Sequence, residues 1–338
     1  MLPAFDSPRL LADIGGTYAR FTLEAAPGVF EHAATLRCAD HADFHAAVSA
    51  YLGAMPAGQV QHAAVAIANP VEGDEVRMTN YHWQFSIEQM RQRLGLATLV
   101  VVNDFTALAM ALPRLAPDGK RQIGGGAARE RSVVGLLGAG TGLGVSGLIP
   151  ADDGFIALGT EGGHASFSPR DEREIAILRH ALGEFDHVSF ERLLSGPGLE
   201  LIHDWLCERA GLRRARRTAA QISEVGLRTW RAGEAAHAQQ ASALCLQSLQ
   251  RFCALLGGFA ADVALTLDAR GGLYIGGGIV PRLGDFVEQS LLRERFEDKG
   301  RFSSLLAGVP IYVIHSRHPA LLGAAAALQQ HMERVHHA

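Results

Sequence analysis

The stretch "LLADIGGTYARFTL", residues 10–23, decides how the fold of this chain is interpreted. An apolar strand runs into Asp13, breaks on Gly15 and Gly16, and resumes as a strand after Thr17. Glycine weakens a strand interior, but paired glycines allow a tight hairpin and a close approach of backbone to a ligand. Taken alone, the stretch is equally compatible with an ordinary turn beside a capping Asp.

A second copy of this pattern stands in the middle of the chain. The stretch "SVVGLLGAGTGLGVSGLI", residues 132–149, again has an apolar strand, a glycine turn with a Thr, and an apolar strand. Two copies of one unusual arrangement indicate a duplicated α/β unit. Two such turns facing each other across a cleft could hold a polyphosphate from both sides.

The remaining pattern predicts alternating strands and helices. The predicted strands are 9–14, 20–25, 29–36, 62–68, 75–80, 98–104, two around the turn within 132–149, 272–279 and 309–315. The predicted helices are 40–52, 86–95, 105–112, 172–182, 189–194, 198–210, 235–267 and 320–334. Residues 114–130 are rich in Gly, Pro and charge, which is typical of a crossing between domains.

The length of 338 residues favours two domains, since one hydrophobic core rarely grows so large. We expect a small α/β domain over residues 1–114 and a large α/β domain over residues 115–318. The C-terminal helix, residues 319–338, is expected to pack back onto the small domain.

Composition excludes several classes of protein. A net charge of −4 gives no reason to expect nucleic acid or an anionic membrane as a partner. The four cysteines form no C-x-x-C pair, which favours a reduced compartment and no structural zinc. The N-terminus lacks a signal-peptide pattern, and the apolar run "CALLGGFAADVALTL" is too short to span a bilayer. We therefore expect a cytoplasmic protein.

Lysine usage excludes two phosphate-binding arrangements. Lys120 and Lys299 are the two lysines of the chain. Neither stands in a P-loop, and neither follows a glycine-rich hairpin as in protein kinases. Phosphate chemistry here has to proceed without a catalytic lysine of those types.

Three further motifs complete the pattern: "VVNDFTA", "GTEGGHASF" and "SFERLLSGPG". With these in order behind D-x-G-G-T and G-A-G-T-G-L-G, the chain resembles the bacterial glucokinase family of the actin–hexokinase superfamily. The resemblance runs from Asp13 to the terminal helix. It implies an α/β, two-domain actin/hexokinase-like (ribonuclease H-like) fold, with a mixed sheet in each domain and a cleft between them. It also implies a homodimer that uses ATP and Mg²⁺ to convert glucose into glucose 6-phosphate and ADP, feeding glycolysis.

Asp104 is the candidate catalytic residue. It follows a buried, parallel-type strand, where a carboxylate is a natural acceptor for a hydroxyl proton. By resemblance it is the base that acts on the 6-hydroxyl of the sugar, although a helix N-cap is an alternative role for it. The resemblance implies that the sugar hydroxyls are bound by Asn103, Asp104, Glu161, His164 and Glu191.

The nucleotide site is expected at the glycine turns. Asp13 is expected to reach Mg²⁺ through water, because Mg²⁺ keeps much of its hydration shell. Thr17 and Thr141, with the glycine amides beside them, are expected to contact the phosphates. The full set of expected nucleotide-binding residues is Asp13, Ile14, Gly15, Gly16, Thr17, Gly140, Thr141, Gly142, Ser195, Gly196, Gly276, Gly277 and Gly278.

Some residues depart from the family pattern or permit another interpretation. Ala12 replaces a common Gly, and Tyr18 replaces a common Asn, so we expect a nucleotide affinity that differs from that of relatives. Glu161 and His164 spell E-x-x-H, a di-iron spacing on helices, but the two glycines between them argue against a helix. Without the family match, Glu191 would be interpreted as an exposed helix charge.

Three other functions compete with glucose phosphorylation. "GAGTGLG" invites a dinucleotide-binding interpretation, but Leu143 occupies the position of the third glycine and a strand follows where a helix is needed. A kinase for fructose, mannose or an N-acetylated amino sugar is the nearest alternative. A sugar-responsive regulator is another, although only about a dozen residues precede Asp13, too few for a DNA-binding domain.

Overall fold

The computed structural model describes residue 5 and residues 7–55, 60–78, 81–152, 154–212, 216–233 and 240–337. Its packing divides the chain into two compact units. The first comprises Met1–Ala116, Ala151–Gly159 and Ser316–Ala338, and the second Pro117–Pro150 and Thr160–His315. Residues 151–159, which we expected in the large domain, are thus grouped with the first unit, although the strand Gly154–Thr160 belongs to the sheet of the second. Gln330 in the C-terminal helix donates to the carbonyl of Phe155 at 2.8 Å, which ties this segment to the first unit.

The first unit is built on a five-stranded mixed sheet of order β3-β2-β1-β4-β7. Strands β1, β4 and β7 are parallel, and β2 and β3 continue the sheet as antiparallel hairpins. The strands are β1 (Arg9–Ile14), β2 (Tyr18–Ala26), β3 (Val29–Arg37), β4 (His62–Ile67) and β7 (Thr98–Asn103). A small separate hairpin joins β5 (Glu75–Arg77) to β6 (Gln84–Ser86).

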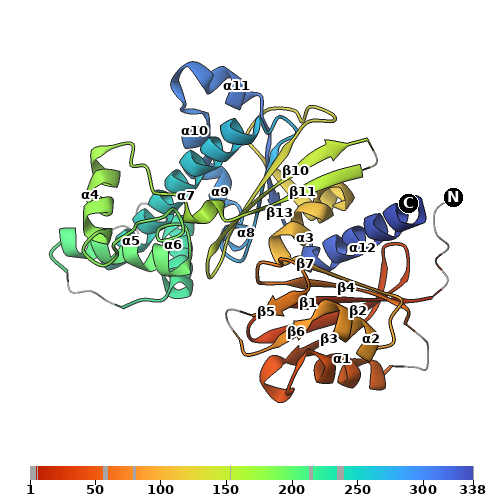
Figure 1. The fold of residues 1–338 in the computed structure, drawn as a ribbon. Coiled ribbons are helices and arrows are strands. Elements are labelled where there is room, and N and C mark those ends of the chain that lie inside the picture. Colours follow the sequence, from red (N-terminus) through yellow and green to blue (C-terminus); the bar gives the residue numbers. More distant parts are fainter. Residues whose placement is uncertain are drawn as a thin grey trace. The chain divides into compact units, whose positions relative to one another are not determined.

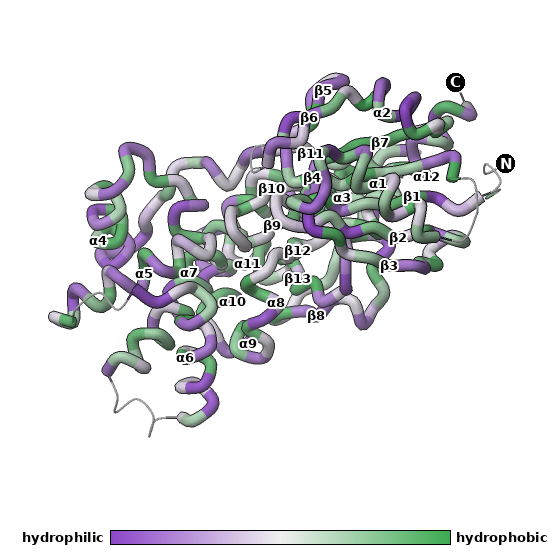
Figure 2. The backbone as a smooth tube through the Cα atoms, turned by 90° about the horizontal axis from the view of Figure 1, so that it is seen from below, coloured by the Kyte–Doolittle hydropathy of each residue, from purple (hydrophilic) through white to green (hydrophobic). Residues whose placement is uncertain are grey.

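Helices cover both faces of this sheet, because side chains alternate along each strand. In β1, Leu10 and Ala12 belong to the core beneath α1 and α2, whereas Leu11 packs toward α3 and α12. Figure 1 shows α1 and α2 on one side of the sheet and α3 and α12 on the other. In Figure 2, hydrophobic residues recur along these strands and along α12. The helices are α1 (Phe44–Gly53), α2 (Ile87–Arg93), α3 (Asp104–Ala111) and α12 (Pro319–His337).

The second unit repeats the plan with a six-stranded sheet of order β11-β10-β9-β12-β13-β8. Apart from β8 at its edge, this sheet has the same strand order as the first: in each, the third, second, first, fourth and fifth strands along the chain lie side by side. A duplicated unit is expected to have this repeated order. Strands β9, β12 and β13 are parallel, and β10 pairs antiparallel with β9. The strands are β8 (Lys120–Ile123), β9 (Val134–Ala139), β10 (Leu143–Ala151), β11 (Gly154–Thr160), β12 (Leu273–Gly276) and β13 (Ile311–Ile314).

The core of the second unit forms around α7, whose buried residues include Leu249, Phe252 and Phe259. Helices α5, α6 and α10 pack against it. The helices are α4 (Glu172–Ala181), α5 (Gly196–Arg209), α6 (Ala219–Ala232), α7 (Gln240–Leu267), α8 (Val280–Leu283), α9 (Phe286–Gln289), α10 (Leu292–Glu297) and α11 (Ser303–Ala307).

Several elements differ from the sequence prediction. Residues 189–194 form a bridge and turns rather than a helix. Ser189 pairs with Ser166 in an isolated bridge, and the Phe190 and Glu191 amides donate to the carbonyls of Ala165 and Gly163, each at 2.9 Å. The segment 114–130 is not only a crossing, since β8 within it pairs with β13. Helices α6, α9, α10 and α11 and strands β6 and β11 were not predicted. Residues 235–239 of the predicted long helix lie outside the described residues.

Helix α7 is longer than the apolar run from whose length we excluded a membrane span. Within the described residues, α7 is long and apolar enough to cross a membrane by length and composition, because it extends beyond the run "CALLGGFAADVALTL". However, 72% of its most apolar 18-residue window is buried inside the protein. A core helix of a folded protein has this property.

Two adjacent glycines of α7 give a matched test of this packing. A Cβ at Gly257 would overlap the backbone carbonyl of Leu292 in α10, whereas the nearest atom at Gly258 is a guanidinium nitrogen of Arg295 at 3.9 Å. Gly257→Ala should therefore lower the free energy of unfolding by about 2 kcal/mol or more. Gly258→Ala should leave it unchanged or raise it by up to about 1 kcal/mol, because Ala favours a helix. Urea unfolding of both variants measures the difference, and equal midpoints would contradict the packing.

Candidate active site

The first glycine turn joins β1 to β2, where Ile14 pairs with Ala19. The Gly15 amide donates to the carbonyl of Tyr18 at 3.0 Å, which closes the turn. Among the described residues, the amides of Gly16 and Thr17 have no protein partner. Two adjacent free N–H groups at the end of a strand can donate to an anion such as a phosphate. The side chain of Ile14 is buried in the core, so it cannot itself contact a nucleotide.

Asp13 lies at the same end of β1. Its carboxylate is 17% exposed and accepts a hydrogen bond from Arg20 across the hairpin, with 3.0 Å between Oδ2 and Nη1. A half-buried carboxylate beside free backbone amides can hold a hydrated Mg²⁺ ion and leave the amides for the phosphates that this ion accompanies. The residues present therefore fit Mg²⁺ through one carboxylate, water and phosphate oxygens. Within the described residues no group of three or more His, Cys, Asp or Glu side chains could form a full protein cage for a metal.

Asn103 and Asp104 stand where β7 passes into α3. The Oδ1 atom of Asn103 accepts from the amides of Phe105 and Thr106 at 2.9 and 3.1 Å, so Asn103 is the N-cap of α3. The alternative role of Asp104 as the cap is thereby wrong, because Asp104 is the first helical residue. This cap fixes the backbone that presents the Asp104 carboxyl group.

Burial, and to a smaller extent the negative charge of Asp13, raise the pKa of the Asp104 carboxyl group from 3.8 to about 6. Hydrogen bonding from the Phe105 amide acts in the opposite direction. The carboxyl ends of the parallel strands β1 and β7 lie at one edge of the sheet, which explains why the two carboxyl groups interact. A carboxylate with a pKa near 6 is ionised at neutral pH and is a stronger base than an ordinary Asp.

The second glycine turn joins β9 to β10 in the second unit. Ala139 pairs with Leu143, and the Gly140 amide donates to the carbonyl of Gly142 at 2.8 Å. In the described part of the chain, the amides of Thr141 and Gly142 have no protein partner, like those of the first turn. The side chain of Thr141 is exposed. This strand–turn–strand geometry, with β10 antiparallel to β9, also rules out the dinucleotide-binding arrangement, which requires a helix after the turn.

Two other segments fix the second turn. The Gly196 amide donates to the carbonyl of Gly140 at 2.8 Å, and the Ile279 amide donates to that of Ala139 at 3.1 Å. Ser195 is the N-cap of α5, and its hydroxyl donates to the carbonyl of Glu191 and accepts from the Gly198 amide. The Ser195 side chain and the Gly196 amide are thus used within the protein, and we interpret them as supports of the turn.

The glycines after β12 approach the same turn. Gly277 has a φ of 83°, and a Cβ there would overlap the backbone of Ala139. Gly276 is buried, whereas Gly277 and Gly278 are exposed. The helix that follows, α8, has only four residues, so its dipole contributes little to anion binding.

The three predicted sugar-binding side chains of the second unit lie together. His164 Nε2 is 3.9 Å from Glu161 Oε2 and 3.9 Å from Glu191 Oε1. Glu161 and His164 are exposed and flank a single 3₁₀ turn, so they do not share a helix as a di-iron site would require. Glu191 lies in turns rather than on an exposed helix face, and its Oε2 accepts from the Leu143 amide at 2.9 Å. Sequence analysis missed this bond to the second glycine turn.

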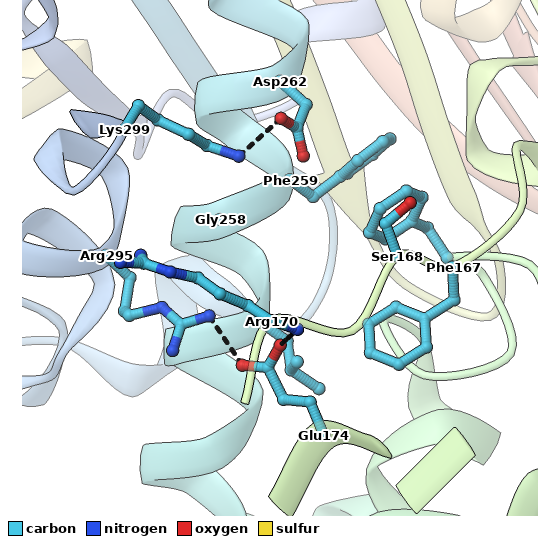
Figure 3. A pocket seen from close by; sticks show the side chains of 11 residues that line it. Phe167, Ser168, Arg170, Glu174, Gly258, Phe259, Asp262, Arg295 and Lys299 are labelled. Atoms are coloured by element: carbon cyan, nitrogen blue, oxygen red, sulfur yellow. Dashed lines mark hydrogen bonds and ion pairs between the residues drawn. The ribbon is translucent and has the colours of Figure 1, made fainter. Parts of the chain in front are cut away.

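A separate pocket in the second unit contains none of the residues predicted for the site. Figure 3 shows Glu174 held by Arg295, at 2.6 Å, and by the backbone of Arg170, while Lys299 pairs with Asp262. Its charges are paired with one another, and the aromatic rings of Phe167, Phe190 and Phe259 complete its wall. We interpret this network as a connection between α4, α7 and α10.

Comparison with known proteins agrees with this geometry. A family model described as Glucokinase matches residues 10–331. A glucokinase from Chromobacterium violaceum is 54% identical over 96% of this chain and 90% of its own length. The crystal structure of a glucokinase from an Antarctic psychrotroph is 34% identical, covers 95% of this chain and 98% of its own, and superposes with a TM-score of 0.85.

The two glycine turns on duplicated sheets and these matches define a protein with the two-domain actin/hexokinase-like fold. The chain belongs to the glucokinase family. It is also 52% identical, over 97% of its length, to "Bifunctional protein glk" of Burkholderia pseudomallei. The chain spans about half the length of that relative, 49%.

Proposed function

We propose that this protein is a glucokinase, which transfers the γ-phosphoryl group of ATP to the 6-hydroxyl of glucose. The observation that carries the proposal is the family match over nearly the whole chain. The chemistry of the site supports it independently. Phosphoryl transfer needs positioned phosphates, neutralisation of their charge and an acceptor for the hydroxyl proton, and the described residues supply groups suited to each task.

In this mechanism the carboxylate of Asp104 accepts the proton of the 6-hydroxyl as that oxygen attacks the phosphorus atom. Its pKa of about 6 makes it basic enough for this role while keeping it ionised at neutral pH. Glu161, His164 and Glu191 bind sugar hydroxyls, for which carboxylates and imidazole supply directional partners. The cap formed by Asn103 holds the Asp104 backbone in place.

The free amides of the two glycine turns bind the phosphate oxygens, and the exposed hydroxyls of Thr17 and Thr141 add further donors. Asp13 holds Mg²⁺ through water, and the ion when bound supplies neutralisation of phosphate charge. We further infer that the protein works as a homodimer in the cytoplasm, without nucleic-acid or membrane partners. The four buried, free cysteines and the net charge of −4 support this placement.

The test is a panel of sugars with ATP and Mg²⁺, measured as initial rates of ADP formation. Glucose should give the highest kcat/KM, and the product should be oxidised by glucose-6-phosphate dehydrogenase. A higher kcat/KM for fructose, mannose or an N-acetylated amino sugar would identify that sugar, instead of glucose, as the substrate. Glucose binding without any ADP formation would favour the sugar-responsive regulator instead.

A further inference from the structure

The carboxylate of Glu191 connects two parts of the second unit that sequence analysis treated separately. Its Oε1 lies 3.9 Å from Nε2 of His164, another predicted sugar-binding residue. Its Oε2 accepts a hydrogen bond from the Leu143 amide, the first residue after the second glycine turn, at 2.9 Å. One carboxylate is thus held by the nucleotide turn while its other oxygen is presented to the sugar.

The space beside this carboxylate is set by Gly142. A Cβ added to Gly142 would lie 2.6 Å from Glu191 Oε2 and 3.4 Å from its carboxyl carbon. Contacts this short are not tolerated by carbon and oxygen atoms, so one of them has to move. Glu191 Oε2 is the far end of a flexible side chain, whereas the turn is fixed by Gly196 and Ile279 through backbone bonds. The carboxylate is therefore the group that would be displaced.

The backbone of Glu191 is independently fixed. Its amide donates to the carbonyl of Gly163 at 2.9 Å, and its carbonyl accepts from the Ser195 hydroxyl at 2.7 Å. A displaced carboxylate thus cannot be compensated by a shift of the backbone. The hydrogen bond from the Leu143 amide to the Glu191 carboxylate selects one side-chain conformation of Glu191 among those that its backbone allows.

We propose that Gly142, although it lies in the nucleotide turn, is a positioning residue for sugar binding. It acts by leaving room for the Glu191 carboxylate to accept from the Leu143 amide. This inference rests on the proposed function, because it takes Glu191 as a sugar ligand. It deepens that function by making the conformation of the second glycine turn a determinant of affinity for the sugar.

The test is the dissociation constant for glucose, measured by calorimetry in the absence of any nucleotide. Gly142→Ala should raise it about tenfold or more, the range for losing a hydrogen bond to a charged group. Gly140→Ala is the matched control in the same turn, since its Cβ would meet only the Gly278 amide nitrogen at an ordinary 3.7 Å. Its effect should fall on the KM for ATP, with less than a twofold change in the dissociation constant for glucose.

A double variant separates positioning from damage to the fold. Glu191→Gln should itself weaken glucose binding, and adding Gly142→Ala should weaken it little further, because both changes act through one carboxylate. Additive losses in the double variant, or an unchanged dissociation constant in Gly142→Ala, would overturn the inference. Failure of the unmodified protein to bind glucose would instead overturn the proposed function, so the two failures are distinguishable. A cooperative thermal transition of Gly142→Ala well above the assay temperature excludes a loss of the fold as the cause.

Discussion

Replacing Asp104 by Asn is expected to lower kcat for glucose phosphorylation by about 10²- to 10⁴-fold, the range for loss of a general base. Asn has nearly the same shape and keeps an oxygen that can accept from the Phe105 amide, as Asp104 does at 2.9 Å. It cannot accept a proton at neutral pH. Initial rates at saturating glucose and ATP measure the effect, and a variant that retains most of its kcat would remove Asp104 from this role.

The same substitution is expected to stabilise the fold at alkaline pH. The pKa of Asp104 is raised from 3.8 to about 6 in the folded protein, so folding favours its protonated form. The stability that this protonated group contributes is present below about pH 4 and is lost as the pH rises through about 6. A shift of this size corresponds to at most about 3 kcal/mol. Asp104→Asn should therefore unfold at a higher temperature than the parent at pH 8, and the difference should vanish near pH 4.

Asp43 gives a control with the opposite sign. It is also an Asp at a helix start, but hydrogen bonding from the Ala46 amide is the main effect that lowers its pKa. Asp43→Asn should not stabilise the protein at pH 8. In the parent enzyme, kcat/KM should fall about tenfold per pH unit below pH 6 as Asp104 becomes protonated. A stabilising Asp43→Asn, or a flat profile between pH 5 and 7, would contradict this account.

The parts of the fold that the sequence predicts are those carried by local patterns. The β1–β2 and β9–β10 hairpins follow from apolar runs on either side of paired glycines, and these turns have the geometry that the pattern indicates. The helix predicted from residue 86 begins there, because the Ser86 hydroxyl accepts from the amide of Gln89 three residues on. Such features depend on neighbours in the chain.

The parts that the sequence could not predict depend on distant contacts. Strand β8 lies in a segment rich in Gly, Pro and charge, and it becomes a strand because β13 offers it an open edge. Residues 189–194 have helical composition, yet they form a bridge and turns beside residues 163–166, where Ser189 pairs with Ser166 and the Glu191 amide donates to Gly163. Helix α6 is strongly amphipathic, and a search for helical periodicity after Thr218, which forms a capping box with Gln221, would have found it.

The same distinction applies to the candidate site. The order of the motifs predicted Asp13, Asp104 and the glycine turns as site residues, but it gave no reason for Asp104 to have a raised pKa. That property arises from burial and from Asp13 on another strand. The contact between Glu191 and Leu143 likewise joins two motifs that are far apart in the chain.

The second large effect is expected for Asp13→Asn, which removes one negative charge and leaves the shape of the side chain unchanged. The KM for ATP should rise about 10- to 100-fold, the usual cost of losing a group that orients a metal site, and the Mg²⁺ optimum should move upward. Arg20 loses its partner, but it is 39% exposed and can be solvated, so the fold should persist. Because the charge of Asp13 helps to raise the pKa of Asp104, the acidic limb of the pH–rate profile should also move to lower pH.

Glu191→Gln is the comparison, since it should raise the KM for glucose and leave both the Mg²⁺ optimum and the acidic limb in place. If both variants were defective mainly toward the same substrate, or if Asp13→Asn left the acidic limb unmoved, the assignment of Asp13 to the metal and of Asp104 to the proton would be wrong.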